Sequence, residues 1–184
     1  MTNAPQVRRR RDAVRNDERI LDAAHQVMAS TGPDASMEAI ATQAGVGVGT
    51  IYRSIGNKDL LIEAVLQQML ASIEKAALDA VPSVESGGLE HFLAAVGETL
   101  HSAHGYAELW FGREVDVDAT ERIRAAIGTL EEAAMASGTV APSTQPGDLL
   151  TLVRALAAII RLGAGRDSWR RFVRVHLAGL RADN

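Results

Sequence analysis

The residues that most suggest a ligand site are three glycines at alternate positions in the stretch GVGVGT, from Gly45 to Thr50. Glycine-rich loops bind phosphate because their backbone N–H groups can approach it closely. A dinucleotide fingerprint requires glycine at position 50, and a mononucleotide loop requires a lysine directly after Gly49; both motifs follow a β-strand. Here position 50 is threonine, no lysine follows, and the preceding residues have helical periodicity. We therefore expect no nucleotide at these glycines.

Other side chains that do chemistry are few and scattered. The chain has no cysteine, which excludes disulfides, thiolate nucleophiles and cysteine-ligated zinc. His101, His104 and Glu108 have a helical spacing compatible with a metal, but three scattered ligands with Gly105 between them fit surface or pocket-lining roles better. No nucleophile, base and orienting group stand out as a set. We expect no catalytic residue, no metal and no cofactor, and thus no enzyme.

The composition is that of a folded helical protein. Of 184 residues, 47% are hydrophobic, 23% are charged and only 4% are aromatic, while alanine and leucine abound. This mixture favours helix over strand. The longest apolar run, Ala155 to Ile160, is far below the roughly 20 residues of a membrane span, and the N-terminus lacks the apolar segment of a signal peptide. A cytoplasmic location without membrane contact is the expectation.

Positive charge is concentrated near the N-terminus. The formal net charge is −4, yet residues 1–60 carry +1 and residues 61–184 carry −5. Within the first sixteen residues, five arginines face a single acidic residue, Asp12. Such asymmetry is typical of a protein whose N-terminal end meets a polyanion.

The apolar periodicity divides the chain into helices. Residues 1–15 have no such periodicity, and we expect a disordered basic arm there. Helices can be capped at their N-termini by Asn16 or Asp17, by Ser36 and by Asn57. Gly45 stands where a helix would end in the left-handed conformation. No segment has the alternation of a strand, so the prediction is an all-α fold of about nine helices. The expected helices are residues 17–32, 37–44, 48–55, 58–80, 89–104, 106–113, 118–137, 147–164 and 167–182.

Three residues around the glycines fit a helix-turn-helix. That motif needs a small residue inside its first helix, which Ala41 provides. Four residues later the turn needs a positive φ, which Gly45 adopts without steric strain. Six residues further, Ile51 can anchor the second helix in the core. The alternative, two ordinary core helices joined by a loop, would not require all three residues together.

The stretch from Ile20 to Leu66, ILDAAHQVMASTGPDASMEAIATQAGVGVGTIYRSIGNKDLLIEAVL, resembles the DNA-binding domain of the TetR family of transcriptional regulators. The ordered string of Ile-Leu-Asp-Ala-Ala, Met-x-x-Ile-Ala, Ala-Gly-Val, Gly-Thr-Ile-Tyr and Asn-Lys carries the resemblance. The sequence departs from the family pattern at Ser54, Ile55 and Gly56, where histidine, phenylalanine and proline or a polar residue are common. Gly47 also stands where serine often caps the recognition helix.

The resemblance implies a helix-turn-helix domain at residues 16–58 and a helical regulatory and dimerisation domain at residues 59–184. It implies a sequence-specific repressor that a small-molecule effector releases from a near-palindromic double-stranded DNA operator. Residues 48–54 would enter the major groove, where an α-helix can reach the edges of the bases. The expected DNA contacts are Gly47, Val48, Gly49, Thr50, Tyr52, Arg53, Ser54 and Lys58.

The larger domain is expected to bind the effector and a second copy of the chain. Apolar residues of the middle helices, with a few polar ones, are candidates for an effector pocket: Phe92, Val96, Leu100, His101, His104, Tyr106, Trp110, Phe111 and Arg154. In the TetR family the last two helices pair with their copies as a four-helix bundle. The residues expected at that homodimer contact are Leu152, Leu156, Ile159, Ile160, Trp169, Phe172, Val173, His176 and Leu180.

Two other functions stay open at this point. One is a small helical enzyme or ligand carrier that binds its ligand in the apolar middle region. In such a protein the predicted recognition helix would have no function. The other is an architectural protein that binds DNA without sequence preference, which salt dependence and competitor DNA would distinguish.

Overall fold

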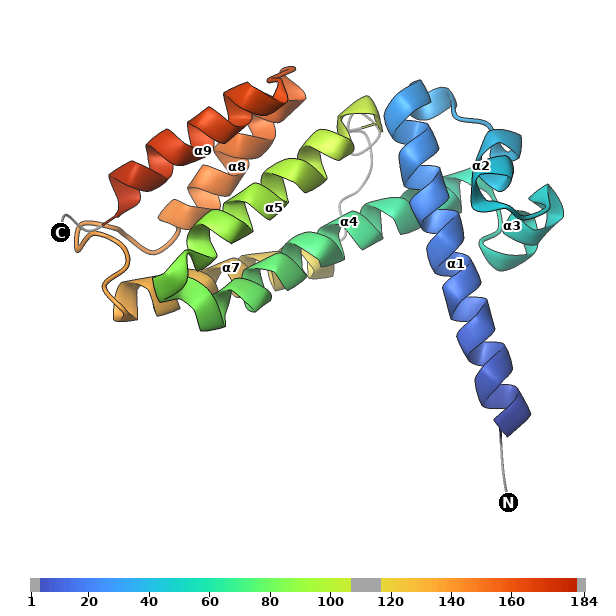
Figure 1. The fold of residues 1–184 in the computed structure, drawn as a ribbon, viewed down its shortest axis with the longest axis horizontal. Helices are drawn as coiled ribbons and strands as arrows, with labels where there is room; N and C mark the ends of the chain where they lie inside the picture. Colours follow the sequence, from blue (N-terminus) through green and yellow to red (C-terminus); the bar gives the residue numbers. More distant parts are fainter. Residues whose placement is uncertain (1–3, 107–116, 182–184) are drawn as a thin grey trace. The chain divides into compact units, whose positions relative to one another are not determined.

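The computed structural model describes residues 4–106 and 117–181, of which residues 4–12 and 33 are described by their backbone alone. Eight α-helices and three short 3-10 helices make up these ranges, and their one β feature is an isolated bridge between Val140 and Arg181 (Figure 1). The all-α prediction is confirmed. No helix within the described ranges is long and apolar enough to cross a membrane.

The first helix, α1, spans Ala4–Thr31 and is longer than predicted. The helix was expected to begin near Asn16 and to follow an arm without regular structure, and that expectation is wrong from residue 4 onward. Alanine, glutamine and arginine have high helix propensity, and a helix without an apolar face gives no periodic signal. The run of arginines at residues 8–11 therefore belongs to the helix.

The first compact unit comprises Met1–Gln68. It contains α1, the 3-10 helix η1 (Gly32–Asp34), α2 (Met37–Ala44), α3 (Val48–Ser54) and the start of α4 (Lys58–Ala80). Two of the predicted caps are confirmed: the Ser36 hydroxyl accepts a hydrogen bond from the N–H of Ala39 at 3.1 Å, and Asn57 Oδ1 accepts one from Leu60 at 3.0 Å. The cap predicted at Asn16 or Asp17 is wrong, because both residues lie inside α1. The core of this unit is formed by Ile20, Ala24, Met28, Ile40, Ile51 and Leu61, all nearly inaccessible to solvent.

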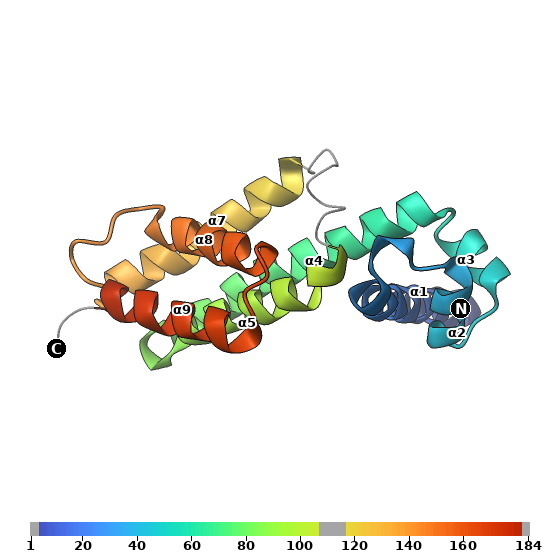
Figure 2. The same ribbon diagram turned by 90° about the horizontal axis from the view of Figure 1, so that it is seen from above.

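The second compact unit comprises Met69–Asn184. It contains the rest of α4, the 3-10 helices η2 (Val81–Ser86) and η3 (His104–Tyr106), and the helices α5 (Gly88–Ser102), α7 (Val117–Ala136), α8 (Asp148–Arg161) and α9 (Arg166–Leu180). In Figures 1 and 2, α8 and α9 lie side by side, and both pack against α5. The centre of this unit is formed by the fully buried side chains of Phe92, Leu93, Ile127, Leu130, Leu156 and Trp169.

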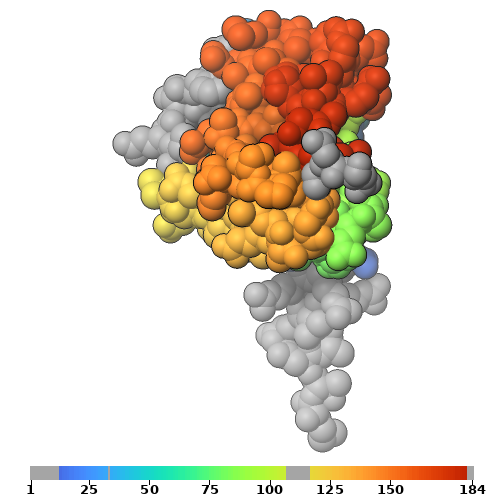
Figure 3. All heavy atoms as spheres, turned by 90° about the vertical axis from the view of Figure 1, so that its left-hand side faces the viewer, coloured from blue at the N-terminus to red at the C-terminus, as the bar shows by residue number. Residues whose placement is uncertain are grey.

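A buried carboxylate joins α7 to the start of α8. Glu131, only 6% exposed, accepts hydrogen bonds from the backbone N–H groups of Gly147 at 2.7 Å and Leu149 at 2.8 Å. Gly147 is the N-cap residue of α8 and Leu149 lies in its first turn, and no side chain at the N-cap position caps the helix. The loop before it is held separately, because the N–H of Ala141 donates to the carbonyl of Leu180 at 2.7 Å. Figure 3 shows this connection, in orange, beside the end of α9, in red.

Candidate functional site

The turn between α2 and α3 has the geometry that the sequence predicts. Ala41 is buried inside α2, Gly45 ends that helix with a φ of +66°, and Ile51 is completely buried in α3. The N–H of Val46 donates to the carbonyl of Ala41 at 3.0 Å and closes the turn. An L side chain at Gly45 would adopt a left-handed conformation that only glycine adopts without cost. The three residues predicted to form the helix-turn-helix therefore do so.

The outer surface of α3 carries the residues predicted to contact DNA. Gly47 precedes the helix and offers no side chain to cap it. A Cβ on Gly49 would meet no atom within 4 Å, and a Cβ on Gly47 would meet only the Thr50 hydroxyl at 4.0 Å. Of the predicted contacts, Gly47, Gly49, Tyr52, Arg53 and Ser54 are exposed, and Val48, Thr50 and Lys58 are half-buried.

Three of these side chains, those of Thr50, Arg53 and Ser54, already have partners within the protein. Arg53 Nε donates to the carbonyl of Gly49 at 3.0 Å, and its Nη2 lies 3.4 Å from the Thr50 hydroxyl. Ser54 donates its hydroxyl hydrogen to a carboxylate oxygen of Asp17 on α1. Arg53 therefore lies back along its own helix, and Ser54 ties the end of α3 to α1.

Sequence reasoning missed Arg19, which holds the end of α2. Its Nη2 donates to the carbonyl of Ala44 at 2.5 Å and lies 3.3 Å from where a Cβ on Gly45 would stand. A cation at the C-terminal end of a helix is favourable because that end carries partial negative charge. No local pattern could have indicated this contact, because its partners are separated by 25 residues.

Two further polar contacts connect α1 to its neighbours. The Gln43 amide of α2 donates to the Gln26 amide oxygen at 2.7 Å, and the Gln68 amide of α4 donates to the Asp22 carboxylate at 3.0 Å. Burial lowers the pKa of His25, and the Asp22 carboxylate offsets part of that effect. The first helix thus contacts α2 and α4 through side chains that the sequence analysis did not single out.

The residues predicted to line an effector pocket fall into two groups. Phe92, Val96 and Leu100 are buried along α5, and Tyr106 of η3 is completely buried. His101 is half-buried, and its Nδ1 is enclosed without a hydrogen-bond partner among the described residues. In contrast, Arg154 and His104 are exposed and do not face this interior. Trp110 and Phe111, like Glu108 of the metal alternative, lie outside the described residues.

The residues predicted at a dimer contact also divide. Five of them are buried in the core of their own chain, namely Leu152, Leu156, Ile160, Trp169 and Val173. Ile159, Phe172 and Leu180 are half-buried, and His176 is exposed with its ring stacked on Phe172 at 3.9 Å between centroids. Leu162 and Val175, which were not predicted, are 78% and 61% exposed. The surface that α8 and α9 leave open is therefore narrower than the sequence pattern indicated.

Comparison with known proteins agrees with this geometry. A family model described as bacterial regulatory proteins, tetR family, matches residues 20–65. The TetR transcriptional regulator SCO0520 from Streptomyces coelicolor has 26% sequence identity over 91% of this chain and 99% of that chain, with a TM-score of 0.74. The TetR regulatory protein from Mycobacterium vanbaalenii has 28% identity over 94% and 99% of the two chains, with a TM-score of 0.71.

A more distant likeness shows the fold alone. The ketosteroid transcriptional regulator KstR2 of Mycobacterium tuberculosis has 16% identity over 100% of this chain and 98% of that chain, with a TM-score of 0.62. Among proteins with curated descriptions, no match was found. The family of the matched model consists of regulators and not of enzymes, so the alternative of a helical enzyme is set aside.

Proposed function

The chain belongs to the TetR family of DNA-binding transcriptional regulators, and we propose that it is a repressor that a small-molecule ligand releases from a near-palindromic operator. The observation that carries the proposal is the surface of α3. This short helix is fixed from behind by Ile51, which is completely buried, and turns Tyr52, Arg53 and two bare glycines outward. A rigid support with exposed polar and small residues suits a helix that enters the major groove.

Arg53 is the residue we propose to read the operator sequence. Its guanidinium is exposed and makes two contacts within its own helix, to Gly49 and Thr50. A guanine edge or a phosphate can replace both contacts, and the bidentate geometry of arginine suits guanine best. Tyr52, half exposed, is the proposed phosphate contact on the same surface.

Lys58 is the second proposed phosphate contact. It occupies the first turn of α4, where a positive side chain opposes the partial positive charge of the helix N-terminus. A DNA phosphate at this position would relieve the conflict, because the N-terminus of a helix favours a bound anion. The arginines of the N-terminal part of α1 are proposed to add sequence-independent contacts to DNA.

A single recognition helix of this length touches too few base pairs to select one site in a genome, so we propose that two copies bind together. The proposed contact uses the open face of α8 and α9. Support comes from the apolar side chains left accessible there, above all Leu162, Val175 and the Phe172–His176 stack. The five predicted contact residues that lie in the core of their own chain are left out of this proposal.

The effector is proposed to bind in the interior of the second unit, beside α5 and η3. Phe92, Val96 and Leu100 give this interior an apolar wall, and Tyr106 adds a buried phenol. Support for a polar ligand group comes from His101, whose enclosed Nδ1 lacks a partner among the described residues. The ligand would release DNA by binding more tightly to the state in which the two recognition helices are wrongly spaced.

The test is a footprint on the DNA that flanks the protein's own gene, followed by mobility shifts with single variants. Arg53→Ala and Tyr52→Ala should each abolish the specific shift while leaving the helical circular dichroism unchanged. Arg124→Ala, which removes an exposed arginine of α7, is the matched control and should shift DNA as the unmodified protein does. Unchanged affinity of Arg53→Ala would show that α3 is not the reading helix.

Candidate effectors are then added to the shifted complex. A ligand that releases DNA should lose its effect when Phe92→Leu changes the wall of the proposed pocket, with operator affinity in the absence of ligand retained. A ligand that strengthens the shift instead would contradict release from a repressor and indicate a co-repressor.

A further inference from the structure

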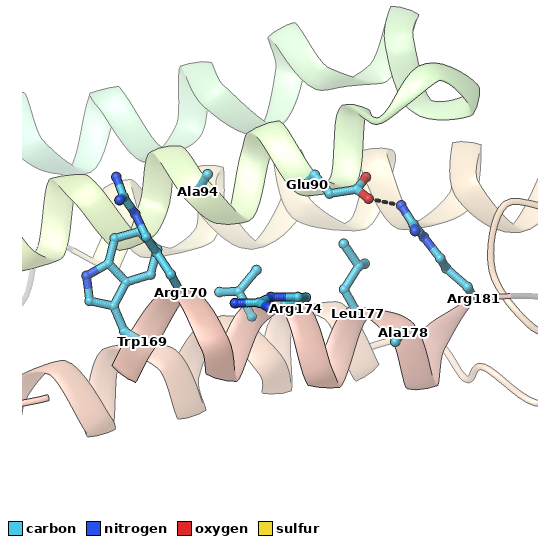
Figure 4. A pocket seen from close by; sticks show the side chains of 9 residues that line it. Glu90, Ala94, Trp169, Arg170, Arg174, Leu177, Ala178 and Arg181 are labelled. Atoms are coloured by element: carbon cyan, nitrogen blue, oxygen red, sulfur yellow. Dashed lines mark ion pairs between the residues drawn. The ribbon is translucent and has the colours of Figure 1, made fainter. Parts of the chain in front are cut away.

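A hollow of about 340 Å³ runs along the seam between α5 and α9, apart from the proposed DNA and effector sites. Its floor is apolar and is formed by Trp169, Val173 and Leu177 with the small side chains of Ala94 and Ala178. Its rim is charged and carries Glu90 together with Arg170, Arg174 and Arg181 (Figure 4). The volume lies at the lower end of the range for small-molecule sites, about 300 to 1,000 Å³.

Ion pairs close the two ends of this groove. On α5, Glu90, Ala94 and Glu98 are spaced four residues apart and therefore share one face of the helix. Glu90 pairs with Arg181 at one end. Glu98 pairs with Arg170 at 2.6 Å, and with a second arginine of α9, at the other end. Ala94, between the two glutamates on this face of α5, carries a methyl group in place of a carboxylate.

Arg174 lies opposite that gap. Figure 4 shows its side chain between Arg170 and Arg181, over the apolar floor. Both flanking arginines have acidic partners, whereas no acidic group among the described residues pairs with Arg174. Within the described part of the chain, a guanidinium without an acidic partner thus stands over an apolar hollow, in a row of ion pairs that lacks one carboxylate.

We propose that this groove binds an organic monocarboxylate with a short aliphatic body. The carboxylate would pair with Arg174, because a guanidinium presents parallel N–H donors that match two carboxylate oxygens. The aliphatic body would cover Val173 and Leu177, which gain by losing contact with water. Because Glu98 and Glu90 already pair with Arg170 and Arg181, Arg174 is the one lining arginine left to bind an anion among the described residues, and one carboxylate matches it.

The first experiment titrates the full chain with octanoate in an isothermal calorimeter, and with acetate, 1-octanol and inorganic phosphate in parallel. Octanoate is expected to bind saturably. Acetate and phosphate carry negative charge but lack the apolar body, and 1-octanol has the apolar body but lacks the charge, so each should bind about tenfold more weakly or not at all. Absence of saturable binding of octanoate, or equally tight binding of 1-octanol, would overturn the proposal.

Two matched pairs of variants locate the binding. Arg174→Gln should weaken octanoate about tenfold, whereas Arg171→Gln, on an exposed neighbour outside the groove, should not. Ala94→Glu supplies the missing carboxylate from the protein itself. It should therefore weaken octanoate to a similar degree and raise the thermal midpoint, while Ala95→Glu, with the same charge change at the next position, should do neither.

The two pairs also separate this groove from the interior of the second unit. If octanoate bound the interior instead, Arg174→Gln and Ala94→Glu would behave like their controls, and the proposal would be wrong. The result does not depend on whether the protein recognises an operator, because no residue of the first unit lines the groove.

Discussion

Gly97 of α5 lies directly against the indole ring of Trp169 of α9. A Cβ on residue 97 would stand 2.4 Å from Cζ3 of the indole and 2.6 Å from Cε3. Both residues are buried, and Trp169 is only 1% exposed. The absence of a side chain at position 97 is what lets α9 carry so large a ring this close to α5.

Gly97→Ala should therefore destabilise the protein by about 1 to 3 kcal/mol, because the added methyl overlaps a ring that the core holds in place. Urea unfolding measures this loss. Gly128→Ala is the control, since a Cβ at that position in α7 meets no atom within 4 Å. The control should gain stability through better helix propensity. Equal stability of the two variants would mean that the indole moves aside without cost.

Arg19→Met should weaken the helix-turn-helix domain. The variant keeps an apolar stem but removes the hydrogen bond to the carbonyl of Ala44 at the end of α2. We expect a loss of about 1 kcal/mol, since the contact is charge-assisted but only partly buried. Hydrogen exchange of the amides of α2 and α3 measures it. Arg15→Met, one helical turn earlier and exposed, should leave that exchange unchanged.

Gly49→Ala separates the effect of this glycine on the stability of α3 from its effect on DNA binding. Nothing within 4 Å of the new methyl opposes it, so the helix should become more stable by up to about 1 kcal/mol. If the bare backbone at Gly49 is needed for close approach to DNA, operator affinity should nevertheless fall by about tenfold or more. Thermal unfolding and a mobility shift on the same sample give both quantities. Unchanged operator affinity would show that this glycine does not approach DNA.

Tyr106 should make the fold sensitive to alkaline pH. Burial raises the pKa of its phenol from the ordinary 10.0 to about 12. Because the folded chain disfavours the ionised form, this stability is fully present below pH 10 and is lost as the pH rises toward 12. In Tyr52→Phe, Tyr106 is the one tyrosine left, and its ultraviolet titration should have a midpoint near 12 or follow unfolding. A midpoint near 10 with the fold intact would contradict its burial.

The helix-turn-helix could be predicted because its determinants are local. Ser36, Gly45 and Asn57 each act within a few residues of their own position, through a cap or a left-handed turn. Such signals do not depend on the rest of the fold. For the same reason most helix bounds after residue 32 agree with prediction within a few residues.

The start of α1 could not be predicted because a helix rich in arginine has no apolar face to detect. Arg19 and Glu131 were missed for a different reason. Each binds backbone groups at least 16 residues away, so its role exists only once the tertiary structure has formed. From its type alone, a charged side chain such as that of Arg19 or Glu131 is predicted to point into solvent.

The predicted dimer contact overestimated what α8 and α9 leave open. A helix with apolar residues on nearly all sides must pack against several neighbours. The pattern does not show whether those neighbours belong to the same chain or to a second copy. Here α5 and α7 of the same chain cover Leu156 and its neighbours. The apolar residues that stay accessible lie outside the predicted apolar faces: Leu162 follows the end of α8, and Val175 is not part of the predicted face of α9.

Glu131 binds the backbone N–H groups of Gly147 and Leu149 and so fixes the end of the loop that precedes α8. The start of α8 is fixed by α7, and Ala141 is fixed by α9, so both ends of the loop are held from outside it. Pro142 and Ser143 lie in this interval and are exposed. The chain should accept a short peptide tag or a labelled cysteine between these two residues, which gives a handle for surface attachment outside the helix-turn-helix unit.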